Sequence, residues 1–496
     1  MIPYFISNKD QKKLDLFQDL LFTHYAQSSK DLMMKFQLTS TTFRRYIQEL
    51  TEDIHHNFES EVSLESDAKV GYELSIHSDK TINYLIESLK IYYIKNSSLY
   101  SLIRLLTTKR YYSVSEIAMD LNFSEPVVYK LLSQLKAMLV PFDVSLNFEK
   151  PNNFDGSEIG VRYFLFLIYW NLFHTFYDHP FSDKFPLEFI NMDFLKKSLH
   201  IKKQLSKLQE TKLKILARII SYRLVFFKKS VNMSDTLLED IQFFNSGTPT
   251  LNIATYNINS VILENESILF NFLVRGIISD IDTLEDKQIL VKKYENSNLT
   301  ISKQVHYFLE KFNEQFKVTY TKENYIETYY LTLMTFIYIK HFNFNVDEYL
   351  SHPINENIAA YKENKRFMEI YPKLLELLKY LPFSHELKEN DIHSFTLLIY
   401  TLYEINSKPQ SVAIYIVHNS NIATPPLIRS AIKKVFNDEL VHFVETPNQA
   451  DIIISDAFEE ITSENNIFYF ENPSNKDTWA SLFTFISSYI YNRVFK

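Results

Sequence analysis

Apolar residues between positions 113 and 139 recur at the spacing of two short helices separated by a tight turn. Ser113 predicts the N-cap of the first helix, and Glu116, three residues later, completes a capping box. The pattern breaks at Asn122, and Ser124 predicts the N-cap of the second helix. The apolar residues that should face inward are Ile117, Ala118, Leu121, Val127, Val128, Leu131, Leu132 and Leu135. Two helices joined in this way form a helix-turn-helix, whose second helix fits the major groove of DNA.

The same pattern occurs once before in the chain. An amphipathic helix is predicted over residues 11–25, and a second begins near Ser29. After a turn at Gln37, Thr39 predicts the N-cap of a third helix with Phe43 on its inner face. The chain therefore contains two predicted helix-turn-helix units in tandem.

Each unit is followed by residues that alternate between polar and apolar. Residues 58–64 and 70–76 predict a hairpin around Gly71, and residues 142–148 with a turn at 152–156 predict another. A hairpin after a recognition helix is a wing. The repeat therefore predicts two winged helices that bind DNA; the alternative is a helical scaffold whose surface arginines are merely solvated.

The open face of each predicted recognition helix carries the side chains that could reach DNA. On the first helix these are Ser40, Thr41, Arg44, Arg45 and Gln48, and on the second they are Glu125, Tyr129, Lys130, Ser133 and Lys136. Arg44 and Arg45 are the strongest candidates, because a guanidinium can bind guanine or phosphate through two hydrogen bonds. Lysines more often position a protein on phosphate than read the sequence.

Beyond the second unit the chain is mainly helical. Residues 81–106 predict one or two connecting helices, and from Gly160 to about Ile405 the apolar spacing is helical throughout. The clearest helical segments are 196–229, 264–282, 302–316, 325–341 and 367–381. This amount of helix fits two bundles of similar size, divided near residues 286–300.

The character of the chain changes at Pro409. Strands are predicted over 412–417 (VAIYIV), 440–444, 450–455 (ADIIIS) and 466–470, and helices over 426–436 and 479–493. Strands that alternate with helices at this spacing predict a small α/β domain with a parallel sheet.

Composition excludes several kinds of chemistry. The chain has five glycines, placed so that they form neither a P-loop nor a GxGxxG loop, and no cysteine, so disulfides, thiolate zinc sites and cysteine nucleophiles are excluded. His174 and His179 are five residues apart and do not share a helix face as a metal pair would, and Asp280 and its acidic neighbours lack a calcium-loop glycine. No nucleophile–base pair stands out. We expect no enzyme activity, no cofactor and no metal.

Charge and hydropathy bear on partners and location. The net charge of −8 is unusual for a DNA-binding protein, so any DNA contact depends on local basic clusters. A monomer with so few basic groups should bind weakly, and a dimer that offers four modules should bind more tightly. The start of the chain does not have the order of a signal peptide, and the most apolar run, 163–176, is too short to span a bilayer. We therefore expect a soluble cytoplasmic protein.

The order of these predicted domains resembles the Mga/AtxA family of virulence transcriptional regulators, which contain PTS-regulation domains (PTS, the sugar phosphotransferase system). The local resemblance is best at LTSTTFRRYIQEL (38–50), at 113–139, and at GSEIGVRYFLFLIYW (156–170), which is similar to the G-x-E-x-x-[IV]-R-Y-F entry to a PTS-regulation domain. VAIYIV and ADIIIS are similar to the first and third strands of an EIIB sheet. The fold class that follows is mainly α and multidomain: winged helices at 1–77 and 78–159, helical PTS-regulation-like domains at 160–286 and 287–406, and an EIIB-like α/β domain at 407–496.

The resemblance also implies regulation. It implies that phosphocarrier proteins of the sugar phosphotransferase system phosphorylate histidines in the helical domains, which adds negative charge and can reposition helices. The candidates by location are His174, His179, His200, His306, His341, His352 and His393. We prefer His200 and His393, which are expected at or near helix starts beside polar residues. An ordinary surface or structural histidine is the alternative for each.

One departure concerns the last domain. A working EIIB domain carries its phosphoryl group on a cysteine after the first strand, where this chain has His418 and no cysteine. The resemblance then implies self-association, and we expect a homodimer that binds double-stranded DNA. The alternatives are a regulator of sugar-utilisation genes with similar architecture, a phosphotransfer component, which the missing cysteine disfavours, and an interaction scaffold that does not bind DNA.

Overall fold

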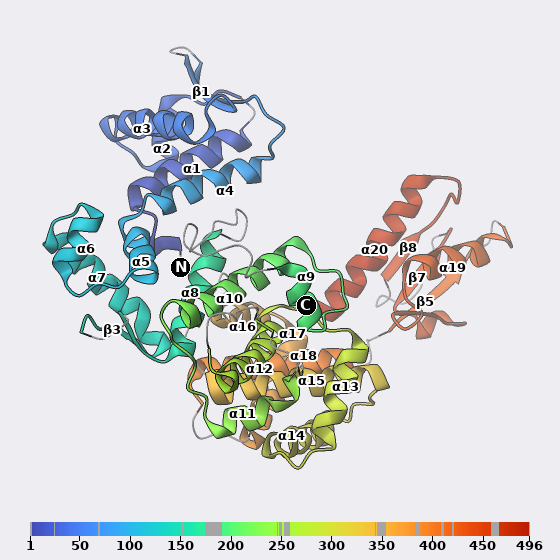
Figure 1. Cartoon of the computed structure of the whole chain (residues 1–496). Helices are drawn as coiled ribbons and strands as arrows, with labels where there is room; N and C mark the ends of the chain where they lie inside the picture. Colours follow the sequence, from blue (N-terminus) through green and yellow to red (C-terminus); the bar gives the residue numbers. More distant parts are fainter. Residues whose placement is uncertain are drawn as a thin grey trace. The chain divides into compact units, whose positions relative to one another are not determined.

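The computed structural model describes most of the chain, and its contacts divide the chain into two compact units. The described residues are 2–23, 25–67, 70–149, 153–173, 191–245, 247, 250–251, 258–342, 344, 354–381, 387–407, 411–418, 421–457 and 466–495. The first unit comprises Met1–Lys303 with Leu333–Pro353, and the second comprises Gln304–Thr332 with Ile354–Lys496. The fold is mainly helical, with a small parallel sheet near the end of the chain (Figure 1).

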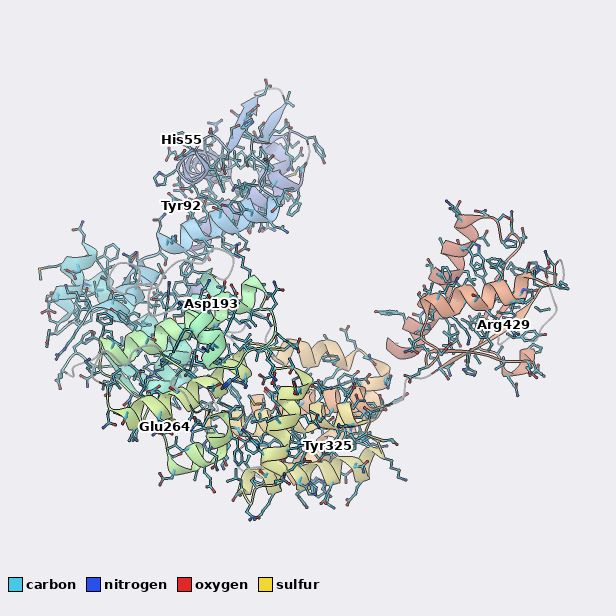
Figure 2. All side chains as sticks on the ribbon, turned by 45° about the vertical axis from the view of Figure 1, so that its right-hand side comes forward. His55, Tyr92, Asp193, Glu264, Tyr325 and Arg429 are labelled. Carbon is cyan, nitrogen blue, oxygen red and sulfur yellow. The ribbon has the colours of Figure 1, made fainter. Side chains whose placement is uncertain are left out.

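The chain begins with a winged helix, drawn in blue in Figure 1. Its elements are η1 (Ile2–Tyr4), α1 (Asn8–Phe22), α2 (Ser29–Phe36), α3 (Ser40–Phe58), β1 (Val62–Asp67), β2 (Gly71–Ile76) and α4 (Ile82–Lys95). Leu32 of α2, Phe43 of α3 and Phe17 of α1 are among its fully buried side chains. In Figure 2, His55 marks α3 and Tyr92 marks α4.

The second winged helix follows directly. Its elements are α5 (Ser98–Thr108), α6 (Val114–Leu121), α7 (Glu125–Leu139), η2 (Val140–Phe142), β3 (Val144–Leu146) and β4 (Phe154–Gly156). Both pairs of strands, β1 with β2 and β3 with β4, are antiparallel hairpins. Each predicted helix-turn-helix is thus followed by a two-stranded hairpin, and the connecting segment predicted at 81–106 forms two helices, α4 and α5.

The remaining helices of the first unit surround an apolar core that is continuous with that of the winged helices. They are α8 (Glu158–Phe173), α9 (Met192–Ser198), α10 (Lys207–Val225), α11 (Asp235–Ile241), η4 (Gln242–Phe244), α12 (Ser260–Ile277) and α13 (Leu284–Glu295). The predicted helical segment 196–229 is divided between the end of α9 and α10. His200 has a left-handed backbone (φ 55°), and its N–H and that of Ile201 bond back to the carbonyls of Lys197 and Lys196, which ends α9.

The next helices lie at the boundary of the two units or in the second. They are α14 (Thr300–Phe316), α15 (Lys322–Phe342), α16 (Ile354–Lys362), α17 (Lys365–Leu377), η7 (Leu378–Tyr380) and α18 (Glu389–Asn406). The division between the units falls within α14 and again within α15. It does not decide where the predicted helical domains begin and end, and those bounds stay predictions.

The chain ends in a four-stranded parallel sheet with flanking helices, drawn in red in Figure 1. Its elements are β5 (Val412–Val417), α19 (Thr424–Val435), β6 (Val441–Phe443), η8 (Pro447–Gln449), β7 (Ile452–Ser455), β8 (Asn466–Tyr469) and α20 (Lys476–Phe495). The strand order is β6-β5-β7-β8, with Ile414 paired to Ile452. Isoleucines of α19 and the strands form one buried cluster with Leu482 of α20. The predicted parallel α/β fold is confirmed.

Candidate nucleic-acid interface

A three-residue turn sets the direction of the first recognition helix, α3. Gln37 adopts a left-handed conformation (φ 54°, ψ 49°) that ends α2. The Leu38 N–H donates to the Met33 carbonyl (2.9 Å), and the Thr39 hydroxyl accepts from the Thr42 N–H, capping α3. Because each residue of the turn is held by a backbone bond, the angle between α2 and α3 is determined locally.

The second helix-turn-helix has the same turn. Asn122 is left-handed (φ 56°, ψ 41°) and ends α6, and the Phe123 N–H donates to the Ala118 carbonyl (3.0 Å). Ser124 occupies the N-cap position of α7 but makes no side-chain cap bond. At the start of α6 the Ser113 hydroxyl accepts from Glu116 N–H as predicted.

Two details of this second unit correct the sequence predictions. The Glu116 carboxylate accepts from the N–H of Tyr112 (2.8 Å), one residue before the cap, so the predicted capping box is not closed. Val127, predicted to face inward, is 44% exposed, because the buried arc of α7 is centred on Val128 and Leu135, which leaves Val127 at its edge.

The structure places all ten predicted DNA-contact side chains on exposed surface. They are Ser40, Thr41, Arg44, Arg45 and Gln48 on α3, and Glu125, Tyr129, Lys130, Ser133 and Lys136 on α7. Because the two turns match, Arg44 occupies the position that Tyr129 occupies in the second unit, and Arg45 corresponds to Lys130. The predicted sets are therefore brought together on two equivalent helix faces.

The local partners of these side chains differ. Among the described residues Arg44 makes no ion pair, and the guanidinium of Arg45 lies 5.5 Å from the ring centroid of Tyr46. The Ser115 hydroxyl donates to Glu125 (2.5 Å), which holds that carboxylate against α6. The two arginines are thus exposed cations that an anionic ligand can reach, as are Lys130 and Lys136 on α7.

The first wing, β1–β2, is joined to the helices by a third short strand segment. The N–H and carbonyl of Gln27 both bond to Tyr72 of β2 (2.9 Å each). Gly71 allows this approach, since a Cβ there would lie 2.1 Å from the Gln27 carbonyl oxygen and its φ is +120°. Glu65 and Glu73 face each other across the hairpin, so this wing is acidic.

In the second wing a side chain replaces the third strand. The carboxamide of Asn153, which is 1% exposed, accepts from the Tyr111 N–H (2.9 Å) and donates to the Tyr111 carbonyl (2.6 Å). It satisfies the same two backbone groups that a strand would have paired. Both wings are therefore fixed to the helices by hydrogen bonds to the segment before α2 or α6.

Residues 83–169 match the family model of the Mga helix-turn-helix domain. This match confirms the resemblance to the Mga/AtxA family of regulators. It runs from α4 to α8 and so contains α5 to β4, whereas the first helix-turn-helix and its hairpin, α1 to β2, lie before it. A search of curated proteins finds no match to the chain. The Mga domain indicates DNA-binding transcriptional regulation.

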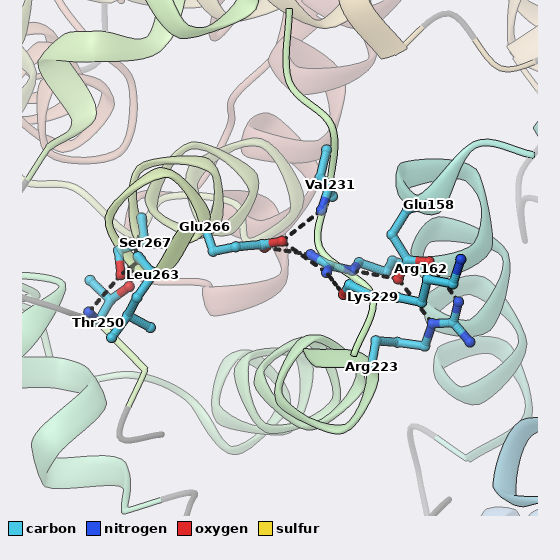
Figure 3. A network of polar contacts seen from close by, with 9 residues as sticks. All are labelled: Glu158, Arg162, Arg223, Lys229, Val231, Thr250, Leu263, Glu266 and Ser267. Carbon is cyan, nitrogen blue, oxygen red and sulfur yellow. Dashed lines mark hydrogen bonds and ion pairs between the residues drawn. The ribbon is translucent and has the colours of Figure 1, made fainter. Parts of the chain in front are cut away.

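A buried network of four charged residues follows the second wing (Figure 3). Arg162 of α8 donates to both oxygens of Glu266 of α12 (2.6 and 3.0 Å) and to Glu158 (3.0 Å). Arg223 of α10 donates to both oxygens of Glu158 (2.9 and 2.6 Å). Burial alone would lower the pKa of Arg162, but the two carboxylates outweigh it and raise that pKa. The network joins the entry of α8 to two helices of the bundle.

Only part of this network was predictable from the sequence. Glu158 and Arg162 belong to the entry motif that carries the family resemblance, whereas Arg223 and Glu266 were missed. Arg223 lies in a largely apolar stretch of α10, and a charge in such a stretch is a signal of a buried partner, whereas Glu266 lies in the polar stretch ENES of α12 and gives no such signal. A cavity of about 240 Å³ lies beside this charged network. It is lined by residues 154–159 and 229–232.

The candidate regulatory histidines have different surroundings. His200 is exposed and lies after the end of α9, so the prediction that it lies at or near a helix start is wrong. His393 lies in the second turn of α18 and is half-buried. His174 falls outside the described residues. His341, at the end of α15, is largely buried and its Nε2 lies 2.7 Å from an oxygen of Asp240.

Asp240 of α11 contacts two side chains of α15. Its Oδ2 is 2.6 Å from Lys340 Nζ and 2.7 Å from His341 Nε2, and its side chain is 3% exposed. Burial would raise the pKa of Asp240, but the hydrogen bonds from His341 and Lys340 lower it below its usual range. This contact was also missed, since the residues are far apart in sequence.

The remaining predictions concern metals and membranes. Among the described residues no group of three or more His, Asp or Glu side chains could hold a metal ion. No helix in the part of the chain that the structure describes is both long and apolar enough to cross a bilayer. His418 lies after β5, and its Nδ1 is 3.3 Å from Asp456 with both side chains buried.

Proposed function

We propose that this protein is a DNA-binding transcriptional regulator of the Mga/AtxA type that works as a homodimer in the cytoplasm. The observation that carries the proposal is the repeated helix-turn-helix, with a matching turn in both units and the Mga family match over the second. Two equivalent helix faces on one chain suit a DNA site that is longer than one module can cover.

The distribution of charged residues along the first recognition helix supports this proposal. Arg44 and Arg45 lie in its first two turns, while Glu49, Glu52 and Asp53 follow in its later turns. The half of a recognition helix near its N-terminus is the half that contacts base edges. The basic residues therefore lie where DNA should bind, although the whole chain has a net charge of −8.

The test is DNA binding by the full chain, measured by mobility shift on its own upstream region across a salt series. We expect affinity to fall with salt, and the Arg44→Ala/Arg45→Ala variant to bind more weakly, with a salt slope lower by about 0.9 for each phosphate that the variant no longer neutralises. Lys292→Ala/Lys293→Ala is the matched control, because it removes the same charge from exposed positions of α13, which belongs neither to a recognition helix nor to the proposed dimer interface. If the protein is folded and binds no DNA at low salt, the scaffold alternative is favoured.

We propose further that the helical domains tune this activity through phosphorylation of histidines by the sugar phosphotransferase system. His200 is the preferred acceptor, because its side chain is exposed. His393 and His174 remain candidates, and phosphorylation of His341 would have to break its bond to Asp240. Incubation with phosphoenolpyruvate and the general phosphotransfer proteins should label the wild-type protein and label His200→Ala less. Equal labelling of both would exclude His200.

Dimerisation is proposed to involve the C-terminal α/β domain. Exposed apolar residues on one side of α19 support this, with Leu427 51% and Val435 58% exposed and Ile422, just before the helix, 96% exposed. Leu427→Glu/Val435→Glu should shift the protein from dimer to monomer in analytical ultracentrifugation. A variant that stays dimeric would place the interface elsewhere.

A regulator of sugar-utilisation genes with the same architecture remains the second candidate. Both candidates bind DNA, so they differ in target and not in the site. Sequencing the DNA fragments that the protein occupies in its own cells would separate the two, since only one candidate predicts binding upstream of sugar-transport genes.

A further inference from the structure

The two recognition helices present different chemistry on equivalent positions. On α3 the residues that line the outward face at intervals of three and four are Thr41, Arg44, Arg45 and Gln48, and on α7 they are Pro126, Tyr129, Lys130 and Ser133. The first set can donate many hydrogen bonds. The second has an apolar ring and an aromatic ring where the first has a hydroxyl and a guanidinium.

The exposed apolar side chains Pro126 and Tyr129 of α7 do not pack in the core of the protein. Tyr129 is 57% exposed, and Pro126 is also exposed in the first turn. Proline is tolerated there because the N–H that it lacks would have no partner within the helix. Among the described residues Tyr129 stacks on no other ring. Neither side chain contributes to the core, so their exposed apolar surface remains available to a ligand.

The carboxylate of Glu125, which also lies on the outward face of α7, is turned away from Pro126 and Tyr129. Glu125 is held by the Ser115 hydroxyl of α6 at 2.5 Å, and this directs its carboxylate toward the preceding helix. Lys130 then supplies a positive charge next to Tyr129, suited to a phosphate. Apart from the Ser133 hydroxyl, the remaining base-reading surface of α7 is therefore formed by Pro126 and the ring of Tyr129.

In the major groove one base offers an apolar group of its own, the C5 methyl of thymine. We infer that the second winged helix recognises thymine methyl groups through Pro126 and Tyr129, whereas the first contacts guanine or phosphate through Arg44 and Arg45. This inference rests on the proposed function, since it names what α7 reads if the chain binds DNA. It predicts that the target DNA contains thymines in the part that α7 contacts and guanines in the part that α3 contacts.

The test removes the methyl groups and nothing else from the DNA. A duplex that the full chain selects from a random pool is resynthesised with deoxyuridine in place of thymidine, and the dissociation constants of the two duplexes are compared. For the wild-type protein we expect the affinity to fall about fourfold for each contacted methyl, which corresponds to the burial of one methyl group.

Three variants assign the effect to α7. Tyr129→Ala should bind both duplexes with more nearly equal affinity, and Tyr129→Phe should keep the difference because the ring remains. Arg44→Ala should bind both duplexes more weakly while keeping their ratio. Tyr491→Ala in α20 is the control, because Tyr491 is a tyrosine of similar exposure, 56%, that belongs to neither recognition helix.

The outcomes separate this inference from the proposed function. Wild-type protein that binds DNA with equal affinity for the two duplexes overturns the inference and leaves the proposed function intact. A difference that Tyr129→Ala preserves in full arises from the altered flexibility of the uridine duplex, and it also overturns the inference. Absence of binding to every duplex contradicts the proposed function itself.

Discussion

Replacing Glu266 by glutamine should destabilise the helical part of the first unit. The Glu266 side chain is 1% exposed and accepts two bonds from Arg162 and one from the N–H of Val231 (2.8 Å). Glutamine has nearly the same size, but it has no charge and offers one oxygen in place of two. The buried network of two arginines and two glutamates, neutral in the wild type, would then carry a net positive charge.

The magnitude follows from the burial of the charges. Removing one partner of a buried ion pair costs about 3–5 kcal/mol, because the other charge stays buried without compensation. Arg162 would keep its bonds to Glu158 and to the Lys229 carbonyl, so the lower end of this range applies. The loss is large compared with the total stability of a domain, about 5–15 kcal/mol.

The assay must report on the first unit separately, because a chain with two compact units need not unfold in one step. Hydrogen exchange of the native protein, followed by mass spectrometry, provides this resolution. Peptides from α8, α10 and α12 should exchange about a hundredfold faster in Glu266→Gln, which is the rate change that corresponds to about 3 kcal/mol. Peptides from β5 and β7 should be unchanged.

Glu264→Gln is the matched control. Glu264 lies on the same helix, two residues earlier, and is exposed (Figure 2). This substitution should change the exchange rates little, by the equivalent of about 0.5 kcal/mol or less. If both variants exchange alike, the buried network contributes no more to stability than a surface charge, and the reasoning is refuted.

Two further predictions follow from single contacts. Gly71→Ala should destabilise the first winged helix by at least about 1–3 kcal/mol through backbone strain, with a further loss from the clash with the Gln27 carbonyl, as measured by exchange of α2 and β2 peptides. Gly276→Ala is its control within α12, where the nearest side-chain atom would be 3.9 Å away, and it should stabilise that helix; equal losses in both would contradict the steric account. Asp240→Asn should destabilise α11 and the end of α15 at neutral pH. Because the folded-state pKa of Asp240 is lowered, its stabilising contribution is present above the unfolded pKa and is lost as the pH falls through the folded pKa. The difference between wild type and variant should therefore close below about pH 4, whereas Asp235→Asn, at an exposed position of the same helix, should show no such closing.

The sequence determined the winged helices in detail because their signals are local. A left-handed residue ends one helix, a Ser or Thr begins the next, and the buried positions repeat at the helical period, so the turn and both recognition faces follow from neighbouring residues. All ten predicted contact residues are exposed for this reason. The parallel sheet was equally predictable, since VAIYIV and ADIIIS are apolar at consecutive positions, as strands buried on both faces are.

Tertiary structure decided the features that depend on partners distant in the chain. Whether Val127 is buried depends on which elements cover the edge of α7, and periodicity alone assigned it wrongly. The partners of Glu158 and His341 are Arg223 and Asp240, which no local spacing connects to them. A buried charge is stable only where packing brings an opposite charge within hydrogen-bond distance, and that distance is set by how the helices pack, not by the residues on either side of the charge.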